Sequence, residues 1–81
     1  MVHEHTVKAF DEDITRLRGL IAEMGGLAEL SLHEAMEALV RGNLDLAARV
    51  IERGSRIESH KAEVEPLAVR IIGLRAPMAV D

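Results

Sequence analysis

The sequence predicts an all-α protein, a long antiparallel helical hairpin, from three observations. Apolar residues make up 48% of the 81 residues, yet Phe10 is the only aromatic one. A core built from Leu, Ile, Val, Met and Ala is typical of helix bundles rather than β-sandwiches. Apolar residues recur at helical spacing on both sides of Gly42-Asn43, and few other residues break the pattern. The prediction is two helices joined by a short turn.

The first helix is predicted to span about residues 7–41. Thr6 is a candidate N-cap, Arg41 lies in the last turn, and Gly42 follows the end, as the chemistry of helix ends favours. One apolar stripe with heptad spacing comprises Phe10, Ile14, Leu17, Ile21, Met24, Ala28, Ser31, Ala35 and Ala38, flanked by Leu20, Leu27, Leu32 and Leu39. The stripe is wider than a two-helix seam needs, which favours a bundle of three or four helices.

Small residues occupy the second half of this stripe, and Gly25-Gly26 come just before them. Small side chains permit close approach of another helix. Each glycine costs a helix about 1 kcal/mol relative to Ala. We therefore expect a bend or soft point at Gly25-Gly26.

The second helix is predicted to span about residues 44–75, with Asn43 as its cap and Asp45 in its first turn. Its seam comprises Leu46, Val50, Ile57, Val64, Leu67, Ile71 and Leu74, and it passes through Arg53 and His60. An interior proline removes a helix hydrogen bond, so Pro66 predicts a kink. Pro77 predicts the start of a third helix, over residues 77–81.

Fourteen acidic and ten basic residues give a net charge of -4, which works against nucleic-acid binding. Basic residues are interleaved with acids at helical spacing and predict solvated faces; they are Arg16, Arg18, Arg49, Arg53 and Arg56. The absence of cysteine, of a signal-peptide pattern and of a long apolar run predicts a cytoplasmic protein without membrane insertion.

Several short segments follow one another in a distinctive order: Phe10-Asp11, Ile14, Leu17, Met24-Gly25, Ala35, Ala38-Leu39, Leu46-Ala47, Val50-Ile51-Glu52 and, most specifically, the ending Leu74-Arg75-Ala76-Pro77-Met78-Ala79-Val80-Asp81. In these segments the sequence resembles the PhoU family of phosphate-uptake regulators. The resemblance implies that residues 1–81 form a single partial domain, the first two helices of a three-helix PhoU repeat. It also implies a cytoplasmic regulator that works between a phosphate transporter and a sensor kinase.

The resemblance further implies metal clusters held by acid-x-x-x-acid motifs, and here the sequence departs from the family. In the matching stretch, residues 54–58, Gly54 stands where the family has an acid, so only Glu58 remains. His60 and Pro66 also depart from the family pattern, at an apolar position and a helix-interior position. We therefore expect no metal site.

The other residues that could bind a metal are better interpreted as solvated surface residues. His3 and His5 lack a third ligand, and Glu29, His33 and Glu37 share a helix face at a spacing common on charged faces. No nucleophile motif or phosphate-binding loop is present, so no catalytic or cofactor site is expected and the chain is predicted not to be an enzyme.

Three functions remain open: a PhoU-like regulatory and interaction module, a purely structural self-assembling hairpin, and a metal-binding helical module. A lone hairpin is expected to expose an apolar band of Leu20, Leu27, Leu32, Leu39, Ile51, Ala68 and Ile72. A second copy would cover that band and complete a four-helix bundle, so we expect a homodimer or higher homo-oligomer.

Overall fold

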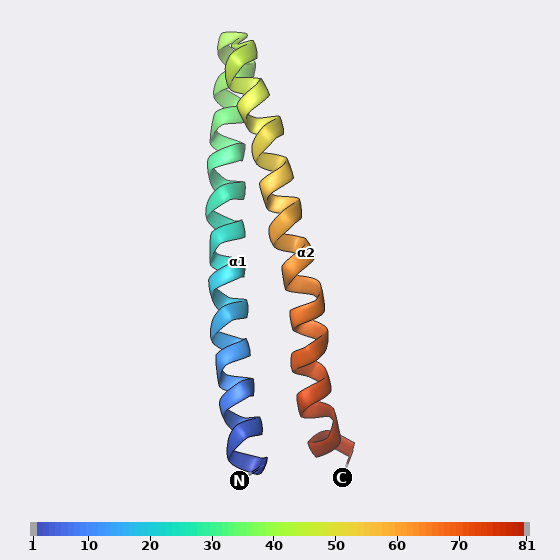
Figure 1. Ribbon diagram of the computed structural model, residues 1–81. Helices are drawn as coiled ribbons and strands as arrows, with labels where there is room; N and C mark the ends of the chain where they lie inside the picture. Colours follow the sequence, from blue (N-terminus) through green and yellow to red (C-terminus); the bar gives the residue numbers. More distant parts are fainter. Residues whose placement is uncertain (1, 81) are drawn as a thin grey trace.

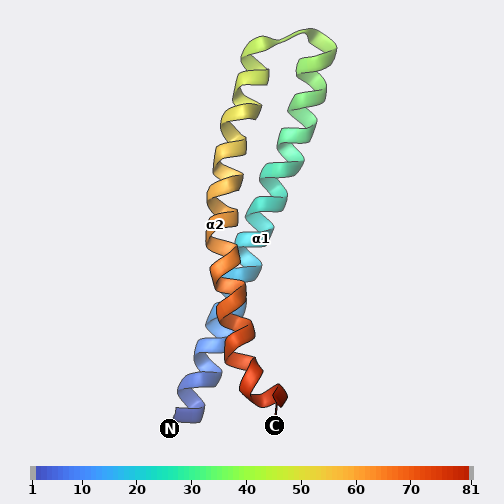
Figure 2. The same cartoon turned by 90° about the vertical axis from the view of Figure 1, so that its right-hand side faces the viewer.

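In a computed structural model the chain forms two long antiparallel helices, α1 (Val2–Arg41) and α2 (Leu44–Val80) (Figure 1). The structure describes the backbone of residues 2–80 and the side chains of residue 5 and residues 7–74. The hairpin measures 59 × 19 × 15 Å. Seen from a second direction, α2 crosses over α1 towards the open end (Figure 2). The predicted all-α hairpin is confirmed.

The turn between the helices follows the predicted capping chemistry. Gly42 has a φ of +64°, a conformation that glycine adopts without a steric penalty. The Asn43 amide donates to the carbonyl of Ala38 at 2.9 Å, which satisfies one of the last carbonyls of α1. The Asn43 side-chain oxygen accepts from the amide of Leu46 at 3.0 Å and so caps α2.

Both helices extend further than predicted at the open end of the hairpin. α1 begins at Val2, so Thr6 lies inside the helix and the prediction that it is the N-cap is wrong. No Gly or Pro precedes it to stop the helix. α2 continues beyond residue 75 to Val80, so a third helix starting at Pro77 is also wrong. A proline in the last turn removes only one hydrogen bond from a helix that neighbouring bonds sustain.

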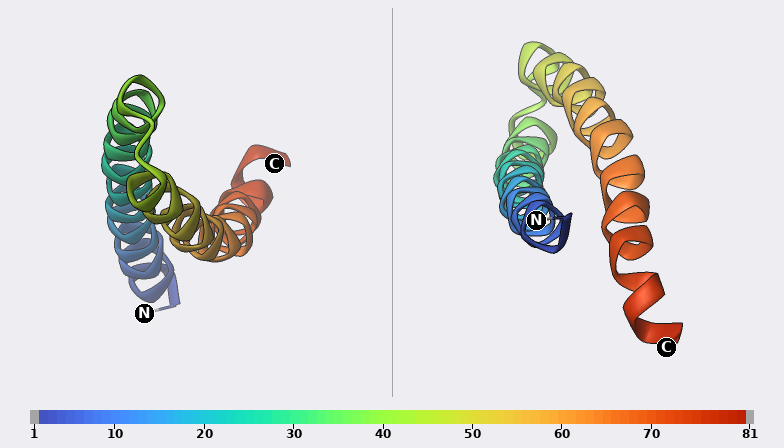
Figure 3. Two further views of the ribbon diagram at one scale, coloured as in Figure 1. Left: turned by 90° about the horizontal axis from the view of Figure 1, so that it is seen from above. Right: turned by 60° about the horizontal axis from the view of Figure 1, so that its bottom comes forward.

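Pro66 lies within α2, which stays helical on both sides of it. The helix follows a curve when viewed along the hairpin (Figure 3). A kink centred on Pro66 stays a prediction.

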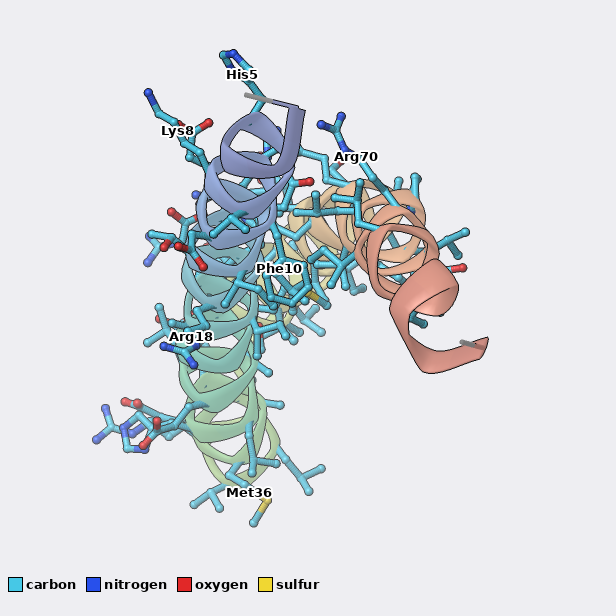
Figure 4. The ribbon with its side chains drawn as sticks, turned by 90° about the horizontal axis from the view of Figure 1, so that it is seen from below. His5, Lys8, Phe10, Arg18, Met36 and Arg70 are labelled. Atoms are coloured by element: carbon cyan, nitrogen blue, oxygen red, sulfur yellow. The ribbon has the colours of Figure 1, made fainter. Side chains whose placement is uncertain are left out.

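The seam between the helices is narrow. Among the side chains that the structure describes, only Ala38 (7% exposed) and Ile71 (8%) are buried apolar residues. Phe10 points from α1 into the space between the helices (Figure 4). On α2 every predicted seam position is at least half-buried, Arg53 and His60 included.

On α1 the residues at the seam differ in part from the predicted stripe. Leu20 and Leu27, predicted as flanks, are half-buried, whereas Ile21 and Ala28, predicted for the core, are exposed. The other predicted stripe positions are buried or half-buried as predicted: Phe10, Ile14, Leu17, Met24, Ser31, Ala35 and Ala38. The seam of α1 therefore differs from the prediction at Ile21 and Ala28, where the preceding residues, Leu20 and Leu27, are the less exposed ones. Asp13 and Glu34 are half-buried beside Ile14 and Ala35.

Candidate functional site

An ion pair lies on the seam at the turn end of the hairpin. The Arg53 Nη1 atom lies 2.7 Å from Glu34 Oε1, and the two side chains are 13% and 18% exposed. The same nitrogen donates to the Ser31 hydroxyl at 3.3 Å. Arg53 was predicted to lie on a solvated face, and that prediction is wrong. Its charge is neutralised across the helix pair, which allows both residues to occupy core positions.

Two further ion pairs join the helices towards the open end. Arg70 Nε lies 2.9 Å from Asp13 Oδ2, with Asp13 largely shielded from solvent and Arg70 exposed. Arg16 donates to Glu63 at 3.2 Å, and both side chains are more than half exposed. The Arg70 side chain extends from α2 towards the beginning of α1, whereas Arg18 points away from α2 (Figure 4).

His60 links the middle of the two helices through both ring nitrogens. Nδ1 lies 2.9 Å from the Arg56 carbonyl within α2, and Nε2 lies 2.6 Å from Glu23 Oε2 on α1. The Arg56 carbonyl first, and then the Glu23 carboxylate, raise the pKa of His60 above its ordinary value, partly opposed by removal from water; the charge of Glu63 adds to the rise. Both contacts favour the imidazolium form.

An apolar groove lies near the turn. It is lined by Ala35, Ala38, Leu39, Gly42, Asn43, Leu44, Ala47, Val50 and Ile51. Three large side chains in this lining are highly exposed, Leu39 (77%), Leu44 (83%) and Ile51 (76%). Met36 also points away from α2 near this end (Figure 4). This surface has the composition of a docking site rather than of a catalytic pocket.

Of the predicted exposed band, Leu32, Leu39, Ile51 and Ile72 are indeed exposed. Leu20, Leu27 and Ala68 are half-buried instead. The band is therefore concentrated nearer the turn than expected.

The described residues bring no group of three His, Asp or Glu side chains together in a geometry that would hold a metal ion. His5 is exposed, and the side chain of His3 lies outside the described part of the chain. Glu29 and His33 are exposed on α1. Glu37 faces Arg41 one turn away, at 3.6 Å, in a surface ion pair of the kind that contributes little.

The PhoU domain model matches residues 21–81 of the chain. A PhoU homologue of Zymomonas mobilis, a phosphate-specific transport system accessory protein, is 53% identical over 77 residues, which cover 95% of this chain and 32% of the relative. The chain belongs to the PhoU family.

Two other accessory proteins of phosphate-specific transport systems align over nearly the whole chain. The homologue of Caulobacter vibrioides is 38% identical over 96% of the chain and 34% of its own length. The protein of Escherichia coli is 31% identical over 99% of the chain and 33% of its own length. The chain thus spans about a third of the length of these relatives. None of the solved structures matches it significantly.

Residues 54–58, the stretch that the resemblance aligned with an acid-x-x-x-acid motif, lie on α2. Gly54 is half-buried, and a Cβ atom added there would meet nothing within 4 Å, so the structure has room for a side chain. Glu58 is exposed on the same helix. The stretch therefore presents a single carboxylate, whereas a hard cation binds best to several oxygen ligands.

Three acidic residues of this PhoU hairpin were not singled out as seam residues from the sequence: Asp13, Glu23 and Glu34. Arg53 and His60 were already visible as polar interruptions of the α2 seam. In an antiparallel hairpin, residues at similar distances from the turn lie side by side, and the separations of Glu34 and Arg53 from the turn, like those of Glu23 and His60, differ by only two residues. A search for acids within one helical turn of the equidistant position therefore finds both contacts.

Proposed function

We propose that this chain is a PhoU-type regulatory module that takes part in the control of phosphate uptake and of phosphate-responsive signalling. Its role is to bind other helices and not to catalyse a reaction. By its family resemblance, the partners are a phosphate transporter and a sensor kinase, and the location is the cytoplasm. Neither α1 nor α2, over the residues described, has a stretch both long and apolar enough to cross a membrane.

The observation that carries this proposal is the apolar groove near the turn, in a chain whose relatives are accessory proteins of a phosphate-specific transport system. The groove is bordered by Leu39, Leu44 and Ile51, which expose large apolar surfaces. Soluble proteins seldom leave such a continuous patch uncovered. An apolar groove between two helices suits a third helix laid along it.

A chimera tests the proposal. Residues 1–81 replace the corresponding segment of the Zymomonas relative, and the chimera is expressed in cells that lack their own PhoU. We expect it to restore repression of phosphate-responsive genes at high phosphate. The same chimera with Leu39→Glu and Ile51→Glu should fail, whereas Ala22→Glu, an exposed position on α1 outside the groove lining, should not.

Failure of the unmodified chimera, when it is folded and present at normal level, contradicts the regulatory proposal. Full activity of the Leu39→Glu, Ile51→Glu chimera contradicts the role of the groove and leaves the family assignment untouched.

A second function is favoured by the same exposed residues when the 81-residue chain is alone. We propose that it then associates with a second copy, so that the two grooves cover one another in a four-helix bundle. The exposed apolar residues Leu39, Leu44 and Ile51 near the turn support this proposal.

A further inference from the structure

The imidazole ring of His60 lies between two oxygen acceptors. The two ring nitrogens both face oxygen acceptors, the Arg56 carbonyl and the Glu23 carboxylate, at 2.9 Å and 2.6 Å. A carbonyl and an ionised carboxylate accept hydrogen bonds and cannot donate them. Both contacts can therefore be hydrogen bonds only when both ring nitrogens carry a proton.

We propose that His60, Glu23 and the Arg56 carbonyl form a proton-binding site that joins α1 to α2 when His60 is protonated and releases this join when it is neutral. We name this contact the His60 link. It lies on the seam, since the His60 side chain is only 20% exposed, and it is the hydrogen-bonded contact between the helices nearest to their middle.

Loss of the proton affects the contact between the helices rather than the contact within α2. A neutral imidazole has one N–H, and the Arg56 carbonyl is held at a fixed place one turn earlier in the same helix. If Nδ1 keeps that proton, the Nε2 lone pair faces the Glu23 carboxylate, which is repulsive. Glu23 is 66% exposed and can turn into water. The contact between His60 and Glu23 of α1 is therefore lost when His60 is neutral.

The charged groups around His60 favour the protonated state from both helices. On α1 the facing group is Glu23, and on α2 Glu63 acts at longer range. Glu63 itself contacts Arg16 of α1, which offsets part of its charge. Arg56 contributes its carbonyl oxygen, and its side chain is exposed.

The direction of the pH effect follows from these groups. The pKa of His60 in the hairpin lies above the ordinary value of 6.5, so the folded state binds the proton more tightly than the unfolded chain does. The stabilisation is fully present below the unfolded pKa and is lost as the pH rises through the folded pKa. The helix pair is thus tightened by a fall in pH across the range where histidine titrates.

Proton NMR titration of the full chain tests the site directly. We expect His60 to titrate at a higher pH in the folded chain than in the urea-unfolded chain, and Glu23→Gln to lower the pKa of His60 in the folded chain. The matched control is Glu52→Gln, which removes the same charge from an exposed position of α2 two turns before His60 and should leave its pKa unchanged. The same pKa of His60 in the folded and the urea-unfolded chain overturns the proposal.

Thermal melting supplies a second readout that a merely structural histidine would not move. The melting temperature of the unmodified chain should fall between pH 5.5 and pH 8.5 by more than that of His60→Leu and of Glu23→Gln, compared at one protein concentration. An equal fall in all three chains contradicts the proposal, even where the variants are less stable throughout.

Discussion

Arg53 of α2 reaches across the helix pair to Glu34 of α1, with Nη1 2.7 Å from Oε1 and both side chains largely shielded from solvent. Two opposite charges thus occupy seam positions that a regular heptad would give to apolar residues. Removal of one charge leaves the other without a partner in a region with little water, whereas removal of both leaves an apolar seam.

We expect Glu34→Ala to lower the free energy of unfolding by about 1–3 kcal/mol, because Arg53 loses its charged partner. The double variant Glu34→Leu, Arg53→Leu should recover most of that loss or exceed the original stability. Urea denaturation followed by circular dichroism, at fixed protein concentration, measures both. Glu37→Ala, in the surface pair with Arg41, is the control and should cost less than about 0.5 kcal/mol. A double variant less stable than Glu34→Ala contradicts this account.

The seam of α1 was predictable from the sequence in part. Helical spacing correctly identified most of the stripe, including Phe10, Ile14, Ala35 and Ala38. At two positions the preceding residue is the less exposed one, Leu20 in place of Ile21 and Leu27 in place of Ala28. Asp13 and Glu34 are half-buried as well, beside Ile14 and Ala35.

The places of Asp13 and Glu34 were not predictable from the hydropathy of one helix, because their partners, Arg70 and Arg53, lie on the other helix. The turn, by contrast, was predictable in detail. Its geometry depends on Gly42 and Asn43 alone, and both have strong local preferences.

Two glycines in the middle of α1 offer a test of the exposed face. A Cβ atom at Gly25 or Gly26 would meet nothing within 4 Å, so α2 does not require either glycine. Gly25→Ala and Gly26→Ala should each stabilise the isolated chain by about 0.5–1 kcal/mol in thermal or urea unfolding. Gly42→Ala is the contrasting control and should destabilise, since φ is +64° there. Destabilisation by the first two variants would mean that another helix packs on this face.

Replacement of Pro66 by Ala should stabilise the chain by up to about 3 kcal/mol, because it restores an amide donor to the interior of α2. Pro66→Gly restores the same donor but adds the backbone entropy of glycine, so its gain should be about 1 kcal/mol smaller. Melting temperatures of the three chains give the comparison. A lower melting temperature of Pro66→Ala would show that the assembled protein needs the proline.

The isolated chain should hold less than one equivalent of iron, zinc or manganese after dialysis against a chelator, because the acid-x-x-x-acid stretch has Gly54 in place of its first carboxylate. Elemental analysis of the dialysed protein measures this. Gly54→Asp restores a pair of carboxylates one helical turn apart and should raise manganese binding in equilibrium dialysis. One or more equivalents retained by the unmodified chain would contradict the prediction.

Self-association of the isolated chain should appear as a dimer or larger species in sedimentation equilibrium at micromolar concentration. Its melting temperature should then rise with concentration, because folding and association are linked. Leu39→Glu and Ile51→Glu place charges in the groove and should shift the equilibrium towards monomer, whereas Ala22→Glu should not. A well-folded monomer with melting independent of concentration would show that the groove does not bind a second copy.

The two-residue connection at Gly42-Asn43 sets the order in which the hairpin assembles. Closing a short loop costs less chain entropy than closing a long one. Ala38 and Val50, which line one groove, therefore come together at a small entropic cost, whereas the contact of Asp13 with Arg70 must close a segment that includes most of the chain. We expect folding to start at the turn and to progress towards the termini, with the low contact order that gives helical proteins fast folding. In hydrogen exchange, the contacts around Ala38 would then be among the first to gain protection and those of α1 near its start the last.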